Sequence, residues 1–452
     1  MNFKRNKIYF SALFMAVLGL AACSKDSSEG EGPSNGESVV LKGQITTATK
    51  LDANKTYVLS GYVRVMDGAS IEIPAGTVIK GETSSKGALI IERGGKIYAN
   101  GTATNPVIFT SDRPVNERKE GDWAGVIICG KSTVNTADGT ALYEGGSLGT
   151  GVASYGGTVA NDNSGSFTYV RIEFSGLAIE KDKEINGLTL CGVGSGTTIH
   201  HVQVSYGGDD SFEFFGGTVN ATHLIAYRGV DDDFDFDQGF TGKLQYGISI
   251  KDPLLADLIG TSRGIELENK GAVTGGLYSR PVLSNFTFIG PGTTNALSFH
   301  GAGIHFGQNS RMVLANSIIV NARTNAVEFN TDFPALELKQ GRSILSNNLV
   351  FGNTADYGMS SVTAFVDAAA LRAFATTAGN VTLANAAAAG ITSISLDAPN
   401  LLLASNSVAL GKAAYTGDLA TGFTQETFVG AMGTSTNWTA GWASWTPKTN
   451  VY

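Results

Sequence analysis

The feature that most constrains this sequence is a strand-rich unit that occurs twice in direct succession. Four positions repeat at an offset of 22 residues: His201 and His223, Asp209 and Asp231, Phe212 and Phe234, and Gly217 and Gly239. A unit this short cannot bury its own apolar face, so it must stack on neighbouring units. Alternating strands that end at glycine, at about this length, are typical of one coil of a parallel β-helix. We therefore predict an all-β solenoid.

The same alternation of apolar residues and glycine turns extends through most of the chain. It is clear in residues 70–81, 88–102, 105–111 and 121–128, where period-two alternation marks strands and glycine marks turns. These segments resemble the opening coils of the pectate-lyase-like β-helix of secreted and lipid-anchored Bacteroidota proteins. The resemblance covers residues 41–355 and implies a right-handed, single-stranded parallel β-helix there. It implies no single activity, because this scaffold carries lyases, hydrolases and adhesins.

The N-terminus predicts export and lipid anchoring. Three basic residues within the first seven precede an apolar run from Ile8 to Leu20, which is the pattern of a secretory signal. Residues 20–23, Leu-Ala-Ala-Cys, are similar to a bacterial lipoprotein processing box. That similarity implies removal of residues 1–22 and attachment of lipid, such as palmitate, to Cys23. The alternative is an ordinary signal peptide in which Cys23 has no such role.

A polar tether is expected between the anchor and the β-helix, over residues 23–40. Residues 24–38 carry no apolar side chain and cannot order themselves. Lys25 and Asp26 resemble the surface-export signal of Bacteroidota lipoproteins, which implies the outer face of the outer membrane. Loss of the signal removes three positive charges, so the net charge of −8 becomes −11. An acidic chain of this kind disfavours nucleic acid as a partner.

The segment from residue 356 to residue 452 has a different pattern. Residues 363–377 have apolar side chains near helical spacing, and Gly379 is a suitable stop. Trp438, Trp442 and Trp445 follow near the C-terminus. We expect this segment to form a short helical and irregular cap in which the tryptophans seal the open end of the β-helix. An aromatic platform for sugars is the alternative.

The two cysteines outside the signal, Cys129 and Cys191, fall in different coils of the pattern. They either pair as a disulfide in an oxidising compartment or remain as two buried free thiols.

Alternation along each strand divides the residues of successive coils into two sets. The inward set is Leu188 and Leu190, Phe212 and Phe214, Phe234 and Phe236, Ile265 and Leu267, Leu297 and Phe299, and Val327 and Phe329. The outward set is Thr189 and Cys191, Glu213 and Phe215, Asp235 and Asp237, Glu266 and Glu268, Ser298 and His300, and Glu328 and Asn330. Three adjacent coils therefore carry carboxylates one above another.

This stacking predicts an acidic ligand site. Coils lie about 4.8 Å apart, so Glu213, Asp235 and Glu266 form one ladder, with Asp237, Glu268 and His300 beside it. Like charges at that spacing need a cation among them or raised pKa values. We predict calcium as the cofactor, bound by Glu213, Asp235, Asp237 and Glu266. The alternative is a solvated acidic face neutralised by nearby basic residues, namely Lys251, Arg263 or Lys270.

Further acidic residues stand at the corners that precede the strands, in residues 209–210 and 231–233. Such residues commonly cap turns. Gly208-Asp209-Asp210 also resembles the paired-aspartate motif of polygalacturonases, inverting hydrolases that need two carboxyl groups with room for water between them. The other motifs of that family are missing from this sequence. The candidate catalytic residues are Asp210, Asp232, Asp235 and Arg263.

These features favour a surface lipoprotein that binds an extracellular glycan or other polymer through its acidic face. The expected partners are the outer membrane, through the lipid anchor, and an outer-membrane transporter for uptake. The alternative is an enzyme on the same scaffold, either an inverting glycoside hydrolase or a calcium-dependent polysaccharide lyase. A lyase would need an arginine or lysine base, for which the candidates are Arg228, Lys251, Arg263 and Lys270.

Overall fold

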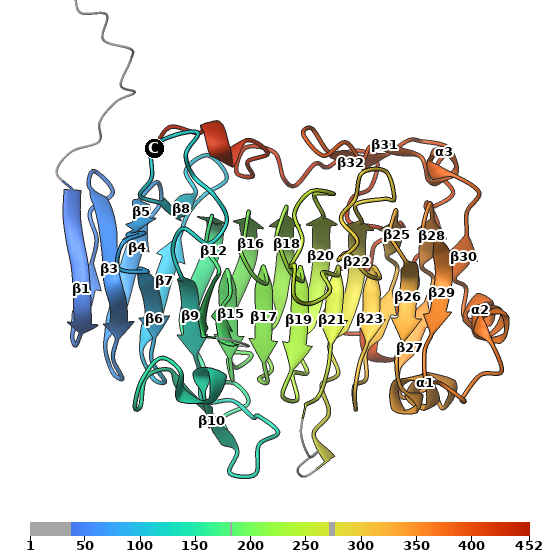
Figure 1. The fold of residues 1–452 in the computed structure, drawn as a ribbon, viewed down its shortest axis with the longest axis horizontal. Coiled ribbons are helices and arrows are strands. Elements are labelled where there is room, and N and C mark those ends of the chain that lie inside the picture. Colours follow the sequence, from blue (N-terminus) through green and yellow to red (C-terminus); the bar gives the residue numbers. More distant parts are fainter. Residues whose placement is uncertain (1–37, 181–182, 271–275) are drawn as a thin grey trace, which may run out of the picture. The chain divides into compact units, whose positions relative to one another are not determined.

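The computed structural model describes residues 38–180, 183–270 and 276–452, which fold as a right-handed parallel β-helix (Figure 1). The predicted fold class is confirmed, because one large sheet of parallel strands winds through successive coils. The predicted signal, Cys23 and the tether as far as residue 37 lie outside the described residues. Strand β1 (Ser38–Ile45) already includes the last three residues of the predicted tether.

Each coil contributes to three parallel ladders of strands. Ladder 1 consists of the second half of β3 (Thr56–Val65), β6 (Ala88–Ile91), β9 (Gly125–Cys129), β15 (Leu188–Cys191), β17 (Phe212–Phe215), β19 (Phe234–Asp237), β21 (Ile265–Leu267), β23 (Ile304–Phe306), β26 (Asn325–Phe329) and β29 (Ala355–Met359). In Figure 1 its labels cross the middle of the picture from β6 to β29.

Ladder 2 lies behind ladder 1 in that view. It consists of the first half of β3, β5 (Val78–Gly81), β8 (Val107–Ser111), the second halves of β12 (Gly165–Glu173), β16 (Thr198–Ser205), β18 (Ala221–Tyr227), β20 (Lys243–Ile250) and β22 (Val282–Ile289), then β25 (Ile318–Val320), β28 (Leu349–Phe351) and β30 (Val381–Thr382). Because β30 pairs with β28, the coils continue beyond residue 355, where the sequence pattern placed the boundary.

Ladder 3 precedes ladder 2 in each coil. It consists of β2 (Ala48–Lys50), β4 (Ser70–Pro74), β7 (Lys96–Asn100), the first halves of β12, β16, β18, β20 and β22, then β24 (Val313–Ala315) and β27 (Ile344–Ser346). The long strands bend between ladders at a residue with positive φ, as at Tyr169, His201 and His223, whose φ values are 50°, 54° and 59°. A single left-handed residue turns the chain by one corner without ending the strand.

Shorter elements lie outside the three ladders. They are the antiparallel pairs β10 (Thr140–Leu142) with β11 (Ser154–Gly156), β13 (Leu177–Glu180) with β14 (Lys183–Ile185) and β31 (Ile391–Ser393) with β32 (Asn400–Leu403), the helices α1 (Asp332–Lys339), α2 (Ala368–Thr377) and α3 (Ala386–Ala389), and the 3-10 turns η1 (Tyr143–Gly146), η3 (Gly417–Leu419) and η4 (Pro447–Thr449). No helix among the described residues has the length and hydropathy to span a membrane.

The core is a column of apolar side chains that repeats from coil to coil. Phe212 stacks on Phe234 with ring centroids 5.2 Å apart, and Phe214 stacks on Phe236 at 4.9 Å. All four rings are fully buried. The repeat therefore has the register that the 22-residue offset predicted, with Phe212 opposite Phe234 and Glu213 opposite Asp235.

One predicted coil is out of register. The sequence pattern placed Leu297 and Phe299 on the inward stack, but Ile304 and Phe306 pair with Ile265 and Leu267 instead. Residues 297–300 instead hydrogen-bond to the long loop of the previous coil, through Leu297 N–H to Pro253 O and Ser262 N–H to Phe299 O. The strand therefore begins later than expected, and His300 does not occupy the ladder position.

The C-terminal segment has two roles. Helix α2 begins after Asp367, whose side chain accepts the N–H of Ala370, and it packs Leu371 and Phe374 against the last coils. The predicted helical cap therefore exists at this end of the β-helix. The tryptophans are not part of it, because the chain after β32 runs back along the side of ladder 2 (Figure 1).

Trp442 shows where the tryptophans pack instead. Its ring is 1 % exposed and lies edge-on against Tyr169 and His201, at centroid distances of 6.0 and 5.5 Å. The expectation that the tryptophans seal an open end was wrong, because the outer face of ladder 2 offers a longer apolar surface to cover. Burial also removes Trp442 from any exposed sugar platform.

The two cysteines are free thiols in adjacent coils. Cys129 lies opposite Cys191 in the register of β9 and β15, and both are fully buried. Burial raises the pKa of the Cys191 thiol, and the neighbouring Cys129 raises it further. Both residues point outward from the column but are covered by the hairpin of β10 and β11.

Candidate functional site

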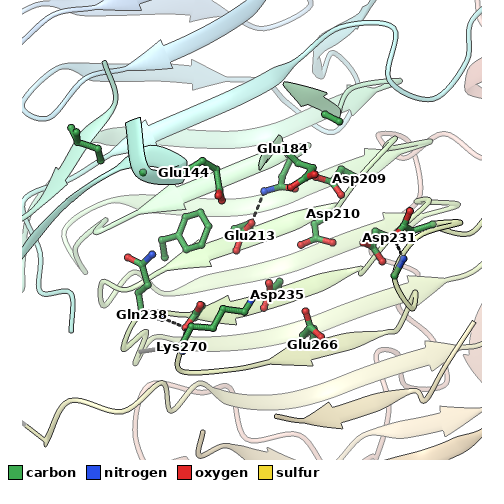
Figure 2. A pocket seen from close by; sticks show the side chains of 18 of the residues that line it. Glu144, Glu184, Asp209, Asp210, Glu213, Asp231, Asp235, Gln238, Glu266 and Lys270 are labelled. Carbon is green, nitrogen blue, oxygen red and sulfur yellow. Dashed lines mark hydrogen bonds between the residues drawn. The ribbon is translucent and has the colours of Figure 1, made fainter. Parts of the chain in front are cut away.

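Three excursions from the coils line a cavity over ladder 1. They are the segment between β9 and β12 that contains the β10–β11 hairpin, the β13–β14 segment between β12 and β15, and the loop between β20 and β21. The cavity has a volume of about 970 Å³, which is at the upper end of the range of about 300 to 1,000 Å³ usual for ligand sites. Figure 2 shows its acidic side chains converging over the strands of ladder 1.

Ten carboxylates line this cavity. They are Glu144, Glu184, Asp209, Asp210, Glu213, Asp231, Asp235, Asp237, Asp257 and Glu266. Among the described lining residues, Lys270 is the only lysine or arginine. The cavity is therefore strongly electronegative.

The predicted carboxylate ladder exists and forms the floor. Glu213, Asp235 and Glu266 lie opposite one another in β17, β19 and β21. The alternative of a neutralised acidic face is correct in part, because Arg263 pairs with Glu266 and Lys270 with Glu268. The ladder is not an open face, however, because Glu213 is 5 % and Asp235 7 % exposed. The excursions cover the ladder, and they belong to no sequence repeat that could have predicted this burial.

Asp210 joins Glu213 and Asp235 at the centre of the floor. Each offers one oxygen, and the three oxygens lie within 4.8 Å of one another. Asp210 Oδ1 accepts the N–H of Asp232 at 2.8 Å, and Glu213 accepts a hydrogen bond from the amide of Asn186. Asp235 Oδ1 is buried and has no hydrogen-bond partner. We call Asp210, Glu213 and Asp235 the floor trio.

The floor trio is electrostatically strained. Burial raises the pKa of each carboxyl well above its usual range. Neighbouring carboxylates raise the pKa values further, chiefly Asp209 for Asp210, Asp235 for Glu213 and Glu266 for Asp235. A positive charge placed among the three oxygens would relieve both effects.

The corner residues divide into two groups. Asp209 and Asp231 line the cavity, and burial raises the pKa of Asp231 to about 7. Asp232 instead accepts the backbone N–H of Arg263, and Asp233 forms a buried ion pair with Lys251 at 3.1 Å. Asp210 and Asp232 thus cap turns, as the sequence suggested, and the catalytic candidate Asp232 does not reach the cavity.

The remaining predicted ligands already have partners. Arg263, a catalytic candidate, pairs with Glu266 at 2.6 Å and does not line the cavity. Asp237 Oδ1 accepts the N–H of Gln238 at 2.6 Å and that of Lys270 at 2.9 Å. Glu268 lies 3.4 Å from the Lys270 ammonium. These contacts leave the floor trio as the best cation site.

His300 was expected beside the ladder, and that expectation was wrong. It is 2 % exposed and pairs with Ser262 in an isolated bridge, away from the cavity. His305 holds the ladder position, opposite Glu266, and bonds to Glu328 at 2.8 Å through its Nδ1. Glu266, Glu268 and His305 also bring three ligand atoms within 4.8 Å, but each of them already has the charged partner described above.

Sequence reasoning missed the residues that the excursions contribute. Glu144, in η1, and Asp257, in the loop after β20, both line the cavity. Burial raises the pKa of Glu144 to about 7, with Glu184 as the next cause. No repeat or spacing connects these residues to the ladder, so the chain pattern held no signal for them.

The donor set of the floor trio fits a hard divalent cation. Calcium is bound by oxygens at about 2.3 to 2.6 Å, so one ion can contact three oxygens that lie within 4.8 Å of one another. The unpartnered Asp235 Oδ1 is an available ligand atom. The clusters accordingly have the residues to hold a metal ion of this class.

Comparison with protein families agrees with the architecture. The family described as pectate-lyase-like β-helix domain matches residues 43–443. Among solved structures, the chain is similar to the crystal structure of pectate lyase Pel9A, with 11 % identity and a TM-score of 0.37, over 87 % of this chain and 98 % of that chain. A similarity at this level assigns no residue. The sequence has no significant match among the curated proteins.

Proposed function

The chain belongs to the pectate-lyase-like β-helix family, and from that premise we propose that its cavity captures an extracellular glycan or other polymer, with calcium held by the floor trio. The scaffold is compatible with glycan binding and with lyase chemistry. The single observation that carries the proposal is Asp235, which offers an oxygen near those of Asp210 and Glu213 and has a buried Oδ1 without a hydrogen-bond partner. Leaving a buried carboxylate in this state is costly unless a cation or a proton joins it.

Calcium binding is tested by its effect on stability. Binding to the folded state alone stabilises it by about 2.7 kcal/mol at a hundredfold excess over the dissociation constant. Thermal unfolding of the mature chain is measured with chelator and with excess calcium. The response should disappear in Asp235→Asn with Glu213→Gln and persist in Glu117→Gln, which neutralises an exposed carboxylate. Equal melting temperatures in chelator and calcium for the unsubstituted protein would defeat the calcium proposal.

Polymer capture is tested separately. The mature chain is incubated with a panel of neutral and acidic glycans, and binding, unsaturated products and reducing ends are followed together. Retention of a polymer without turnover supports a binding protein. Turnover of any polymer replaces this proposal with the enzymatic one.

A polysaccharide lyase is the second candidate, and Lys270 is the observation in its favour. Its ammonium is the basic group of the cavity, beside Glu268. Burial lowers the pKa of Lys270, but the carboxylates of Asp235 and Glu268 outweigh burial and raise it overall. A lysine base must lose its proton, so this role requires a cation on the floor trio that offsets those carboxylates. Loss of unsaturated product in Lys270→Ala, with substrate binding retained, would support it.

We propose further that the protein is anchored through Cys23 on the outer face of the outer membrane, as accessory to an outer-membrane transporter. Residues 20–23 and the acidic and basic pair after Cys23 support this. Metabolic labelling with palmitate should mark the protein and be lost in Cys23→Ser. Protease treatment of intact cells should degrade a surface-exposed chain, and full protection would contradict the location.

A further inference from the structure

The ligand of the cavity must match a surface that is mainly acidic. Among the described residues, the cavity is lined by ten carboxyl groups and one lysine. A divalent ion on the floor trio offsets two charges, and the raised pKa values of the buried carboxyls reduce the charge further. The cavity remains acidic, so it disfavours an anionic polymer such as a polyuronate and attracts a cationic ligand.

Two carboxylate oxygens reinforce the requirement for positive charge. Asp235 Oδ1, on the floor, and Asp231 Oδ1, nearer the corner, are both buried without a hydrogen-bond partner. The Asp235 side chain is more than nine-tenths buried and lines the cavity. A buried carboxylate oxygen without a donor marks a place where a ligand donor is missing.

Two exposed aliphatic side chains, Leu142 and Ile259, are among the residues that line the cavity. Ile259 is 88 % exposed, and Leu258 and Leu254 in the same loop are 64 % and 65 % exposed. Leu142, in β10, is 40 % exposed. Exposed aliphatic side chains gathered beside a cavity are typical of a binding surface for another apolar group.

The aromatic content of the cavity argues against a sugar ring as the apolar partner. Sugar rings usually stack on the exposed face of an aromatic side chain. Among the described lining residues Phe215 is the only aromatic one. Its ring stacks with Tyr155 and meets Tyr143 edge-on, at centroid distances of 6.2 and 6.1 Å, and only 7 % of the residue is exposed.

From these surfaces we propose that the polymer captured by the cavity is a basic, amphipathic polypeptide segment. Its lysine or arginine side chains contact the carboxylates of Asp209 and Asp231, beside the cation on the floor trio, and its apolar side chains pack on Leu142 and Ile259. This inference rests on the proposed function, capture of a polymer in the cavity, and names the class of that polymer. Charge complementarity selects the occupant, since an acidic cavity that also exposes aliphatic side chains matches alternating basic and apolar side chains.

The test measures binding of defined probes to the mature chain in a chelating buffer. The probes are a fluorescent octapeptide that alternates lysine and leucine, its glutamate and leucine counterpart, and a glucosamine hexamer with free amino groups. The lysine peptide should bind, and its affinity should fall as salt screens the carboxylates. The glutamate peptide should not bind.

Two pairs of variants locate the contact. Asp231→Asn should weaken lysine-peptide binding by about tenfold, while Glu117→Gln removes the same charge elsewhere and should leave it unchanged. Ile259→Ser should weaken it by about threefold, while Val366→Ser, at a site that is 89 % exposed on the approach to α2, should not. Melting curves confirm that each variant is folded. Equal effects within either pair overturn the proposal.

The remaining outcomes separate the two levels of inference. Binding of the glucosamine hexamer in preference to the lysine peptide, with sensitivity to Asp231→Asn, overturns the polypeptide and keeps polymer capture. Calcium binding that is sensitive to Asp235→Asn, without binding of any peptide, also overturns only the polypeptide. If no probe, glycan or cation responds to Asp231→Asn or Asp235→Asn, the proposed function fails as well.

Discussion

Replacing Asp235 by asparagine should stabilise the metal-free protein at neutral pH. The substitution keeps the shape of the side chain, removes one charge from the floor trio and adds an amide donor. Asp235 is 7 % exposed, lies between Glu213 and Glu266 in adjacent strands and leaves Oδ1 unpartnered. Removing a group usually destabilises a protein, so a gain here would be specific to this electrostatic arrangement.

The expected gain in the free energy of unfolding from Asp235→Asn follows from two limits. An ionised neighbour about 4.8 Å away costs about 3.5 kcal/mol at an effective dielectric constant of about 20. Two such neighbours, Glu213 and Glu266, would cost about 7 kcal/mol before the attraction of Lys270 is subtracted. Protonation limits this cost, because the folded protein can protonate Asp235 instead of keeping it charged. For a carboxyl with an ordinary pKa of about 3.9, taking up a proton at pH 7.5 costs about 5 kcal/mol, so the penalty cannot exceed that value. We expect a gain of about 2 to 4 kcal/mol.

The sign of the pH dependence is fixed by the pKa shift. Burial, and after it Glu266, raises the pKa of Asp235 well above its usual range. The folded state therefore holds this proton more firmly than the unfolded state. Its contribution to stability is fully present below the unfolded pKa and is lost as pH rises through the folded pKa. At pH 5.0 the ceiling on the penalty falls to about 1.5 kcal/mol, so most of the gain from Asp235→Asn should vanish.

Thermal unfolding in chelator at pH 5.0 and pH 7.5 measures this difference. With an unfolding entropy of about 0.9 kcal/mol/K for a chain of this length, a gain of about 3 kcal/mol raises Tm by about 3 °C at pH 7.5. Glu117→Gln is the control and should change Tm at neither pH. A lower Tm for Asp235→Asn at pH 7.5, or an equal gain at both values, would refute the electrostatic reasoning.

Three further predictions concern the scaffold. Trp442→Ala should cost about 3 to 5 kcal/mol of stability because the ring is 1 % exposed, and glycan retention should not change; a loss of retention in the folded variant would restore the sugar platform. Gly247→Ala should destabilise the protein strongly, since its Cβ would lie 1.9 Å from the ring of Phe286, whereas Gly139→Ala meets nothing within 4 Å and should cost only the strain of its positive φ; similar melting temperatures would contradict this packing. Cys129 and Cys191 should react with a thiol reagent only after unfolding, because both are buried and free, and failure to react in denaturant without reductant would indicate a disulfide.

The sequence by itself determined the coiled fold and the strand register of the two units that repeat at an offset of 22 residues. Alternation at period two decides which side chains of a strand face inward, and the 22-residue offset decides which residues of the next coil lie opposite. Phe212 over Phe234 and Glu213 over Asp235 follow from these two facts alone, and the structure has both pairs. This local periodicity extends as far as Glu266, where the pattern still predicted the correct neighbour.

Only the tertiary structure decided what covers the ladder and which acids meet there. The excursions that bury Asp235 belong to no repeat, so neither the cavity nor the contribution of Glu144 had a signal in the sequence. The sequence also could not distinguish the acidic residues at the corners. Asp209 lines the cavity, whereas Asp232 accepts a hydrogen bond from the N–H of Arg263. The long loop between β20 and β21 displaced His300 in favour of His305, because the residues before β23 hydrogen-bond to that loop. Strand periodicity is set by neighbours in sequence, whereas burial and the meeting of side chains from different excursions depend on contacts between segments far apart in the chain.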